Sequence, residues 1–525
     1  MRMVAGEGEQ QAEHRPDGDH GAAVPPGEAG SRPSLWVSST YFAEGFPYGV
    51  VNNLAEILFK ELGASLQVVG LTALFHLPWN LKFLWGPLLD QYETKRTWIV
   101  ATEVALAVGL ALLAVLAGAS PGLAALSLCF AVLAFLSATH DIAIDGYYLE
   151  SLRERDQSSY VGFRATAYRL ATLVIGGPLL YLIGGALGWT GGLLLASGVM
   201  AALTVYHARW LPRAERRRQP LAELLRRLAT PRRLGWLAAI AVAVLAAAVL
   251  VRTAPLDEAT RAELWSAVAS FAVTLAGWTA FLLLAALVVA LASLDRIRAR
   301  LERRDSPYAS AFVSFLEQPR TALVLAFIIS FRVGESFLVK MRWPFLRDTV
   351  GMTLDDYAIA NGTLGVVAGF AATFVGGKLI ARDGLRRWIW PFVLAQNVLN
   401  LLYVWLAWLG ASASGAVTTA VIALEQFGAG LGTAVFMVYL MRCCDPAHRA
   451  AHMAIVTALM SVSFTLAGVA SGFLAGWMGF ATYFVFTFVV TIPGMALVFF
   501  LPHLDGREAS PASPTNRLER RPASL

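Results

Sequence analysis

Long apolar runs constrain the fold of this 525-residue chain more than any other feature. A helix crosses the hydrocarbon core of a bilayer in about 20 apolar residues, and we count fourteen runs that could do so. Only 15% of the residues are charged, against roughly 25% in soluble domains. The sequence therefore predicts an all-α integral membrane protein. The expected spans are 34–60, 66–89, 97–118, 122–150, 160–184, 187–210, 234–252, 265–293, 321–346, 353–381, 386–409, 415–441, 449–478 and 480–502.

A loop sequence that occurs twice divides these spans into two related halves. Gly86–Arg96 follows the second run, and a degenerate copy, Gly377–Arg387, lies 291 residues later. The glycine lets two helix ends approach closely, the acid can meet a helix N-terminus or a basic side chain, and a basic pair is typical of cytoplasmic loops. We expect a gating loop built on Gly86, Asp90, Lys95 and Arg96.

The expected domain plan has six spans, two additional spans and six more spans. Two six-helix halves occupy 34–210 and 321–502. The segment 211–320 carries the two additional spans and ends in an amphipathic helix, 294–320, whose Phe312 and Phe315 would lie on the inner leaflet. The tails 1–33 and 503–525 have the composition of disordered segments.

The distribution of basic residues predicts the orientation. The formal net charge is +6, which could suggest nucleic acid as a partner, but the basic residues gather in short loops between apolar runs. These loops each follow an even number of spans, so both termini are expected in the cytoplasm. They are 90–96, 211–233, 294–320, 382–387 and 442–449.

Several charged residues lie inside the apolar runs, where charge is costly and usually serves a function or meets a partner. Glu44, Glu335 and Glu425 fall in the first, seventh (not counting the additional pair) and tenth spans, and Arg332 is one turn before Glu335. Glu44 and Glu335 are separated by the same 291 residues as the two loops. We expect proton coupling at Glu335, with Asp141 or Glu425 as the alternative.

The fourth and fifth spans carry the densest group of charges. In an antiparallel helical hairpin, residues at equal depth have position numbers with a constant sum, and Asp141 with Arg169 and Asp145 with Arg164 meet this condition. We expect two acid–base pairs, which serve either as a structural or gating lock or as a substrate contact. Lys82, near the end of the second span, would reach the interface by snorkelling.

No enzyme, metal-binding or nucleotide-binding motif occurs in the sequence. The three cysteines are too few and too scattered for a disulfide framework. We therefore expect no catalysis and no cofactor, and any work must come from an ion or substrate gradient.

Five motifs resemble the AmpG-type muropeptide permeases and related acetyl-CoA transporters of the major facilitator superfamily. They are Tyr41–Gly49, Leu81–Asp90, Ala138–Glu150 with Ala167-Tyr168-Arg169-Leu170 and Gly176-Gly177, Val333–Glu335 and Leu424–Thr433. The resemblance implies a monomeric inner-membrane permease that imports anhydro-muropeptides with protons by alternating access. It also implies that spans 1, 4, 7 and 10 line the path, each with one carboxylate, namely Glu44, Asp141, Glu335 and Glu425.

The chain departs from this family pattern near the expected path. His140 stands where the family usually has Gln, His452 does the same after span 10, and Arg342-Trp343-Pro344 replaces a Thr-rich stretch. Relatives carry acetyl-CoA or siderophores, so these are alternative substrates. A non-transporting membrane sensor of the same ligand is the competing class.

Overall fold

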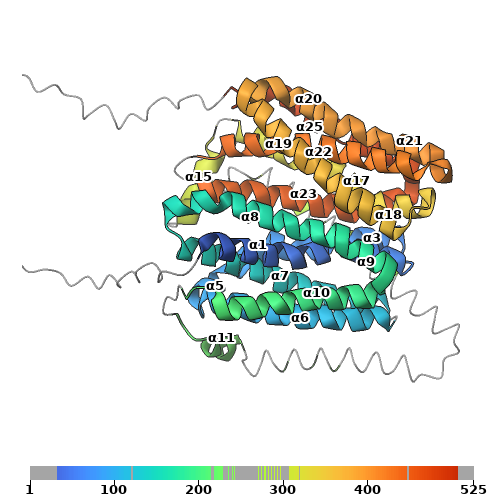
Figure 1. Cartoon of the computed structure of the whole chain (residues 1–525). Helices are drawn as coiled ribbons and strands as arrows, with labels where there is room; N and C mark the ends of the chain where they lie inside the picture. The colour runs from blue at the N-terminus through green and yellow to red at the C-terminus, as the bar shows by residue number, and fades with distance from the viewer. Residues whose placement is uncertain are drawn as a thin grey trace, which may run out of the picture.

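The computed structural model describes residues 32–119, 122–213, 218–228, 307–318, 320–445 and 449–505, with isolated residues between 229 and 306. Within these ranges the secondary structure is helical, apart from one isolated bridge between Tyr92 and Gln219. The N-terminal half, blue to green, and the C-terminal half, yellow to red, form two helical layers that lie against each other (Figure 1). The expected all-α bundle is confirmed.

Nine helices in the described part are long and apolar enough to cross a membrane. The expected spans 234–252 and 265–293 fall almost entirely outside the described residues, as do the tail 1–33 up to residue 31 and the tail after 505. The total of fourteen spans therefore stays a prediction. The nine helices are Lys95–Gly118, Leu123–Ser151, Ser159–Trp210, Thr321–Val350, Leu354–Asp383, Leu385–Ser412, Gly415–Cys443, Ile455–Met478 and Phe480–Phe500.

The N-terminal half is built from interrupted and continuous helices. The first span is interrupted by a π-helical turn and the second by 3-10 turns, and the fifth passes through two π-helical turns before the chain reverses at Gly188 (φ 61°). The helices are α1 (Pro33–Gly49), α2 (Ala55–Glu61), α3 (Leu66–Leu71), α4 (Leu77–Leu81), α5 (Gly86–Gln91), α6 (Lys95–Gly118), α7 (Leu123–Ser151), α8 (Glu154–Val174), α9 (Leu180–Leu182) and α10 (Gly188–Trp210).

The C-terminal half repeats this plan after two short connecting helices, α11 (Leu221–Leu228) and α15 (Pro307–Leu316). Its eighth span contains a π-helical turn, Ala358–Gly365. The helices are α16 (Thr321–Phe331), α17 (Val333–Phe345), α18 (Leu354–Tyr357), α19 (Val366–Asp383), α20 (Leu385–Val398), α21 (Leu402–Leu409), α22 (Gly415–Cys443), α23 (Arg449–Met478), α24 (Phe480–Val489) and α25 (Ile492–Leu497).

The internal repeat is visible in the turns as well as in the sequence. Gly63 (φ 81°) ends the first span and Gly351 (φ 80°) ends the seventh. Two residues later Ser65 and Thr353 cap the next helix, because each hydroxyl accepts a hydrogen bond from a backbone N–H three residues on. The same left-handed glycine and N-cap therefore make the same turn in both halves.

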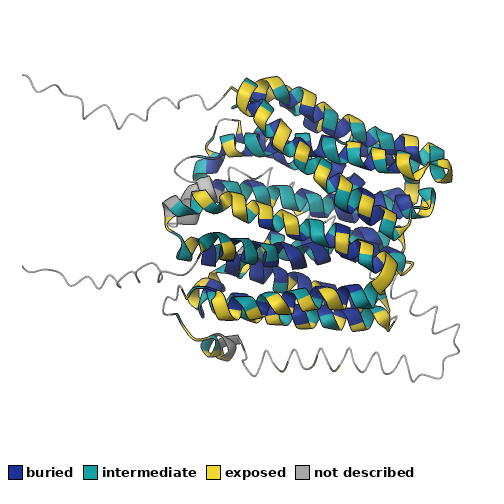
Figure 2. Cartoon of the chain, viewed as in Figure 1, coloured by how far each residue is buried: buried dark blue, intermediate teal, exposed yellow. Residues whose placement is uncertain are grey.

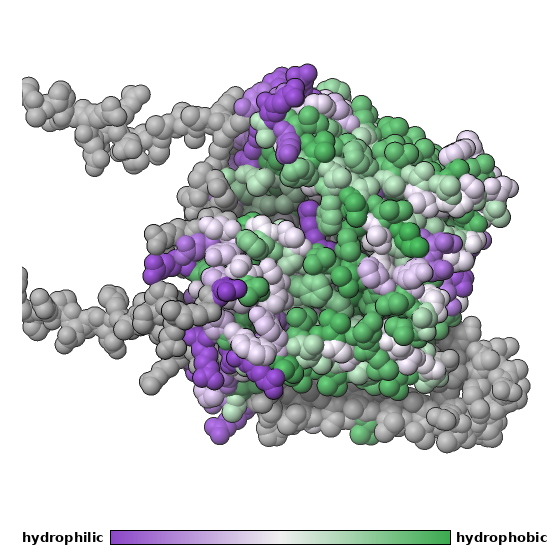
Figure 3. Space-filling model, in the orientation of Figure 1, coloured by the Kyte–Doolittle hydropathy of each residue, from purple (hydrophilic) through white to green (hydrophobic). Residues whose placement is uncertain are grey.

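We call the end of the bundle that carries α5, α11 and α15 the basic end, and the end that carries α3, α9 and α18 the far end (Figure 1). The described chain begins and ends at the basic end. Exposed residues dominate the outer surface while buried ones face between helices (Figure 2). The outer surface is largely hydrophobic (Figure 3), as a lipid-facing surface should be.

Among the described residues, the apolar core joins the two halves towards the far end. One buried cluster contains residues from both halves, for example Phe46 and Leu58 with Phe345 and Phe484. Towards the basic end there are two separate clusters, one around Tyr147 in the N-terminal half and one in the C-terminal half. The halves are therefore sealed together at the far end.

Phe315 lies in the C-terminal cluster rather than on a lipid surface. Its side chain is 1% exposed and packs edge-on against His452 at 5.2 Å between ring centroids. The expectation that α15 lies on the inner leaflet is wrong for Phe315, although Phe312 is exposed. Residues 294–306 of the expected amphipathic helix fall almost entirely outside the described part.

Candidate functional site

A cavity of about 250 Å³ lies between the halves. It is lined from both sides, by α2 and the fifth span in one half and by α17, the eighth span and α22 in the other. Figure 3 shows a cleft between the halves in which hydrophilic surface lies among apolar residues. The polar lining residues are Asn53, Glu56, Thr172, Arg342, Asn361 and Gln426.

The first charged group of the cleft joins spans 1, 2 and 4. Lys82 forms an ion pair with Asp141, and the carboxyl group of Glu44 lies beside that of Asp141. Glu44 and Asp141 are both buried. Lys82 was expected to snorkel to the interface, and this is wrong, because its ammonium group binds Asp141 of α7 instead.

The predicted pair between Asp145 and Arg164 is confirmed. Their charged atoms are 2.8 Å apart, within the range expected of a direct ion pair. Tyr41 donates its hydroxyl to Asp145 at 2.8 Å, and Arg164 stacks over the Tyr41 ring at 4.5 Å. This arrangement couples α1, α7 and α8 through a single charged pair.

The predicted pair between Asp141 and Arg169 is wrong. Arg164 and Arg169 are five residues apart, which on a helix of 3.6 residues per turn places them about 140° apart. Only Arg164 can then face α7. Arg169 instead reaches across the cleft to the C-terminal half, where its guanidinium lies 5.0 Å from the centre of the Phe370 ring.

Two ion pairs lie in the C-terminal half, one partly buried and one fully buried. Arg332 binds Glu335 through two nitrogen atoms, one at 3.0 Å, which confirms that the two residues meet. Glu425 accepts from Arg342 at 2.6 Å, and Arg342 donates a second bond to Asn361 at 2.6 Å. Sequence reasoning marked Glu425 and Arg342 separately and missed that they are partners.

Three ion pairs connect the halves towards the far end. Glu56 of α2 meets Lys340 of α17 at 2.8 Å, and both side chains are buried. Glu61 meets Arg347 at 2.6 Å, and Lys60 meets Asp348. These contacts could not be predicted from local sequence patterns, because the partners lie almost 290 residues apart.

Glycine contacts close the same end. A Cβ atom added to Gly362 would lie 1.7 Å from the backbone oxygen of Gly176, so spans 5 and 8 touch backbone to backbone. A Cβ on Gly472 would lie 2.0 Å from the oxygen of Leu66, which brings spans 2 and 11 together. The Gly176-Gly177 pair thus serves close helix packing.

Polar contacts between spans 2 and 11 continue this seal into the bundle. His76 bonds to Ser461 at 2.6 Å and to Asn52 at 2.9 Å, and Asn80 donates to Thr465 at 2.9 Å. His76 is thus a hydrogen-bonded packing residue whose partners come from both halves.

The expected gating loop lies at the basic end of the N-terminal half. Lys95 is buried and binds Asp90 at 2.5 Å, and its side chain occupies the space that a Cβ on Gly146 would need. Arg96 donates to the backbone oxygens of Leu211 at 3.1 Å and of Ala208. Gly86 was expected to allow a close helix approach, but a Cβ atom added to Gly86 would lie no closer than 4.0 Å to another residue, which is an ordinary contact.

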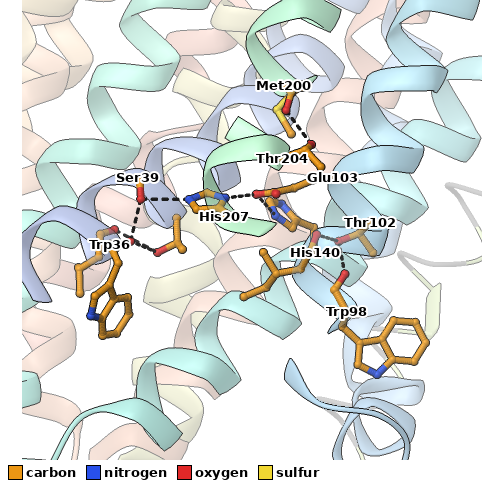
Figure 4. Close-up of polar contacts among 12 residues, drawn as sticks. Trp36, Ser39, Trp98, Thr102, Glu103, His140, Met200, Thr204 and His207 are labelled. Carbon is orange, nitrogen blue, oxygen red and sulfur yellow. Dashed lines mark hydrogen bonds and ion pairs between the residues drawn. The ribbon is translucent and has the colours of Figure 1, made fainter. Parts of the chain in front are cut away.

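A buried polar cluster inside the N-terminal half escaped sequence analysis (Figure 4). Glu103 lies between His207, 2.6 Å away, and His140, 3.3 Å away, and His207 bonds on its other side to Ser39 at 3.0 Å. Glu103, His140 and His207 are fully buried. The cluster ties α1, α6, α7 and α10 together behind Asp141, so His140 faces the interior of its own half rather than the cleft.

Two related helical halves around a charged cleft define a membrane transporter of the two-half carrier class. A family model described as Major Facilitator Superfamily matches residues 37–294 and 323–525, and the chain belongs to that superfamily. Within it, the chain is similar to the AmpG permeases.

Two curated relatives cover most of the chain. An uncharacterized protein of Haemophilus influenzae is 24% identical over 90% of this chain and 95% of its own length. The anhydromuropeptide permease of Escherichia coli K12 is 24% identical over 87% of this chain and 77% of its own length.

Solved structures share the fold. A peptide transporter of the POT family in complex with sulfate covers 92% of this chain and 98% of its own, with a TM-score of 0.62 and 13% identity. A D-xylose–proton symporter covers 91% of this chain and 99% of its own, with a TM-score of 0.58 and 12% identity.

Proposed function

We propose that this protein is a proton-coupled secondary transporter that imports anhydro-muropeptides by alternating access. The observation that carries the proposal is the asymmetry of the contact between the halves. Apolar packing, glycine contacts and three ion pairs join the halves at the far end, while the apolar core divides into two at the basic end. Such a geometry is one end state of a carrier whose halves rock about a central site.

The basic end is cytoplasmic in this proposal, because its loops hold the concentration of Lys and Arg. Both termini then lie in the cytoplasm and the state described here is open inwards. The protein acts as a monomer in the bacterial inner membrane, since one chain supplies both halves of the cleft.

We place the proton on Glu44. A carboxyl group away from water is costly when ionised and unpaired, and no basic side chain of the described residues forms an ion pair with Glu44. The carboxyl group of Asp141 lies beside it, and two adjacent carboxylates repel each other, which favours a proton on one of them. Glu335, the site expected from the sequence, is held by two nitrogen atoms of Arg332, and becomes the alternative.

The substrate is proposed from the anhydromuropeptide permease among the relatives. Acetyl-CoA and a siderophore are the alternatives, because Arg342 stands where the resembling family has a Thr-rich stretch, and it lines the cavity. A sensor that binds the same ligand without moving it is the alternative in a different class.

Uptake by proteoliposomes separates these possibilities. Labelled anhydro-muropeptide, acetyl-CoA and a siderophore are each offered with and without an inward proton gradient. We expect accumulation of the muropeptide only with the gradient, and binding without accumulation would instead identify a sensor.

The same vesicles test the proton site. Glu44→Gln should abolish uphill uptake and leave downhill exchange measurable, while Glu335→Gln serves as the matched carboxyl change in the other half. If Glu44→Gln still accumulates substrate and Glu335→Gln does not, the proton site belongs to Glu335.

A further inference from the structure

The charges of the middle cleft, counted up to the pair of Glu56 and Lys340 at its far-end limit, pair almost completely. Among the described residues there, Lys82, Arg164, Arg332, Lys340 and Arg342 each bind an acid. Their partners are Asp141, Asp145, Glu335, Glu56 and Glu425. One cation, Arg169, and one acid, Glu44, remain without an ion-pair partner in this part of the structure.

Arg169 faces the cavity from the fifth span. Thr172 and Gly176 line the cavity, and residues at i, i+3 and i+7 share one face of a helix. Arg169 therefore projects on the cavity side, one turn nearer to the basic end. Its side chain is exposed, and its contact with Phe370 of the other half places it across the opening.

The position makes an unpaired cation unusual. Arg169 lies about halfway along its span, where a guanidinium in contact with lipid would be costly. Lys378 also lacks an acid among the described residues and lies over Phe374, but it sits less than two turns from the end of α19, where a lysine can reach water. Arg169 is too far from the end of its span to reach water in this way, so its charge needs an anion or water in the cleft.

We propose that Arg169 is the docking site for a carboxylate of the transported solute, and that it is filled together with the proton on Glu44. A guanidinium binds a carboxylate through two parallel N–H bonds, so it selects a planar anion by shape as well as charge. The guanidinium of Arg169 lies 5.0 Å from the centre of the Phe370 ring, and such a contact through one face of the guanidinium does not use its N–H groups. This inference rests on the proposed transport function.

The charge count explains why proton and anion belong together. With Glu44 ionised, the six cations and six acids of the middle cleft balance. A proton on Glu44 leaves Arg169 as one surplus positive charge, and one carboxylate restores neutrality. The two ligands therefore favour each other's binding, and this coupling is reciprocal by thermodynamic necessity.

Other charged groups surround Glu44 and set the background for this coupling. Asp141 and Asp145 approach it from α7 and Arg164 approaches it from α8, while Lys82 lies behind Asp141. These groups are already paired with each other, Lys82 with Asp141 and Arg164 with Asp145. A proton added to Glu44 therefore changes the charge at Glu44 and leaves these two ion pairs intact.

A chemical test reads Arg169 without relying on transport. Purified full-length protein in nanodiscs is treated with phenylglyoxal, which modifies accessible arginines, and the modified positions are measured by mass spectrometry. Arg169 should react faster than Arg164 and Arg332, whose guanidinium groups are engaged by carboxylates.

Protection of Arg169 from phenylglyoxal by simple ligands then tests the proposal. N-acetylglycine should slow the modification of Arg169 by the factor 1 + [L]/Kd, about tenfold at a concentration of about nine times its Kd, whereas the neutral N-acetylglycine amide should not. Protection in wild type should strengthen as the pH falls, while Glu44→Gln, which mimics the protonated acid, should be protected strongly at every pH.

The outcomes are distinct. Equal protection by the acid and the amide, or none by the acid, overturns the anion site, and protection that is equally pH-dependent in Glu44→Gln overturns its link to the proton. A protein that shows the expected protection but accumulates none of the labelled solutes would refute the transport function and leave the anion site standing.

Discussion

The buried ion pair between Glu56 and Lys340 should hold the far end of the bundle closed. Lys340 has a side-chain exposure of 4% and Glu56 of 9%, so Glu56→Gln leaves a buried ammonium without its carboxylate. Breaking one side of a buried pair costs about 3–5 kcal/mol. Opening the far end would hydrate Lys340, so the cost falls on the closed state alone.

This cost converts directly into a change of population. Each 1.4 kcal/mol is about a factor of ten, so Glu56→Gln should shift the equilibrium towards the far-end-open state by roughly two to three powers of ten. Glu61→Gln is the matched control, because its partner Arg347 is 37% exposed. An exposed pair contributes about 0.2–1 kcal/mol, and its loss should shift the equilibrium less than about tenfold.

Spin labels can measure the opening. Gly122 and Gly415 begin α7 and α22 in opposite halves at the far end, and neither has a neighbour within 4 Å of an added Cβ atom. A label at each position should report one distance in wild type and a longer one in Glu56→Gln, by double electron–electron resonance in nanodiscs.

Equal shifts of the distance distribution by Glu56→Gln and Glu61→Gln, or no shift by Glu56→Gln, would show that the pair of Glu56 and Lys340 does not hold the far end closed. The double change Glu56→Lys with Lys340→Glu restores opposite charges and should return the short distance. Failure of that reversal in a folded protein would mean that the pair has a role other than holding the halves together.

Three further results are expected. Gly362→Ala should also favour far-end opening in the spin-label assay, since its Cβ would overlap a backbone oxygen of the other half, whereas Gly185→Ala meets nothing within 4 Å and should have no effect. Glu103→Gln should lower stability by about 1–3 kcal/mol, the cost of unmaking buried hydrogen bonds, seen as a lower midpoint of thermal unfolding in detergent; an unchanged midpoint would show that the two histidines need no carboxylate. Lys82→Met should abolish uptake because it leaves Asp141 without its cation, while Lys82→Arg should retain part of the uptake. Wild-type uptake by Lys82→Met would exclude a role for the ion pair of Lys82 and Asp141.

The order of the described spans followed from the sequence because a bilayer leaves few alternatives to helices of a fixed length. The repeat was also readable, since Gly63 and Gly351 make the same turn in both halves. Interruptions within the spans were not predicted. A π-helical or 3-10 turn depends on how neighbouring helices pack, and the run from Thr72 to Leu84 looks like an ordinary apolar segment in sequence.

The sequence identified most of the charged residues of the candidate site but only some of the ion pairs between them. Depth along a helical hairpin is linear in residue number, and this relation correctly predicted the pair of Asp145 and Arg164. Rotation about the helix axis is the second coordinate, and neglecting it misplaced Arg169. Contacts between the halves, such as Glu56 with Lys340, need the relative placement of two bodies that no local pattern encodes.

The connection between the halves is attached separately at each of its described ends. Arg218 binds Glu150 and the backbone of Leu89 in the N-terminal half, and Phe315 is buried in the C-terminal half. Each half thus holds its own end of the connector by its own side chains, so a change of length between these two anchors leaves both attachments in place. A pair of apolar runs could therefore have been acquired between the anchors without any adjustment at Arg218 or Phe315.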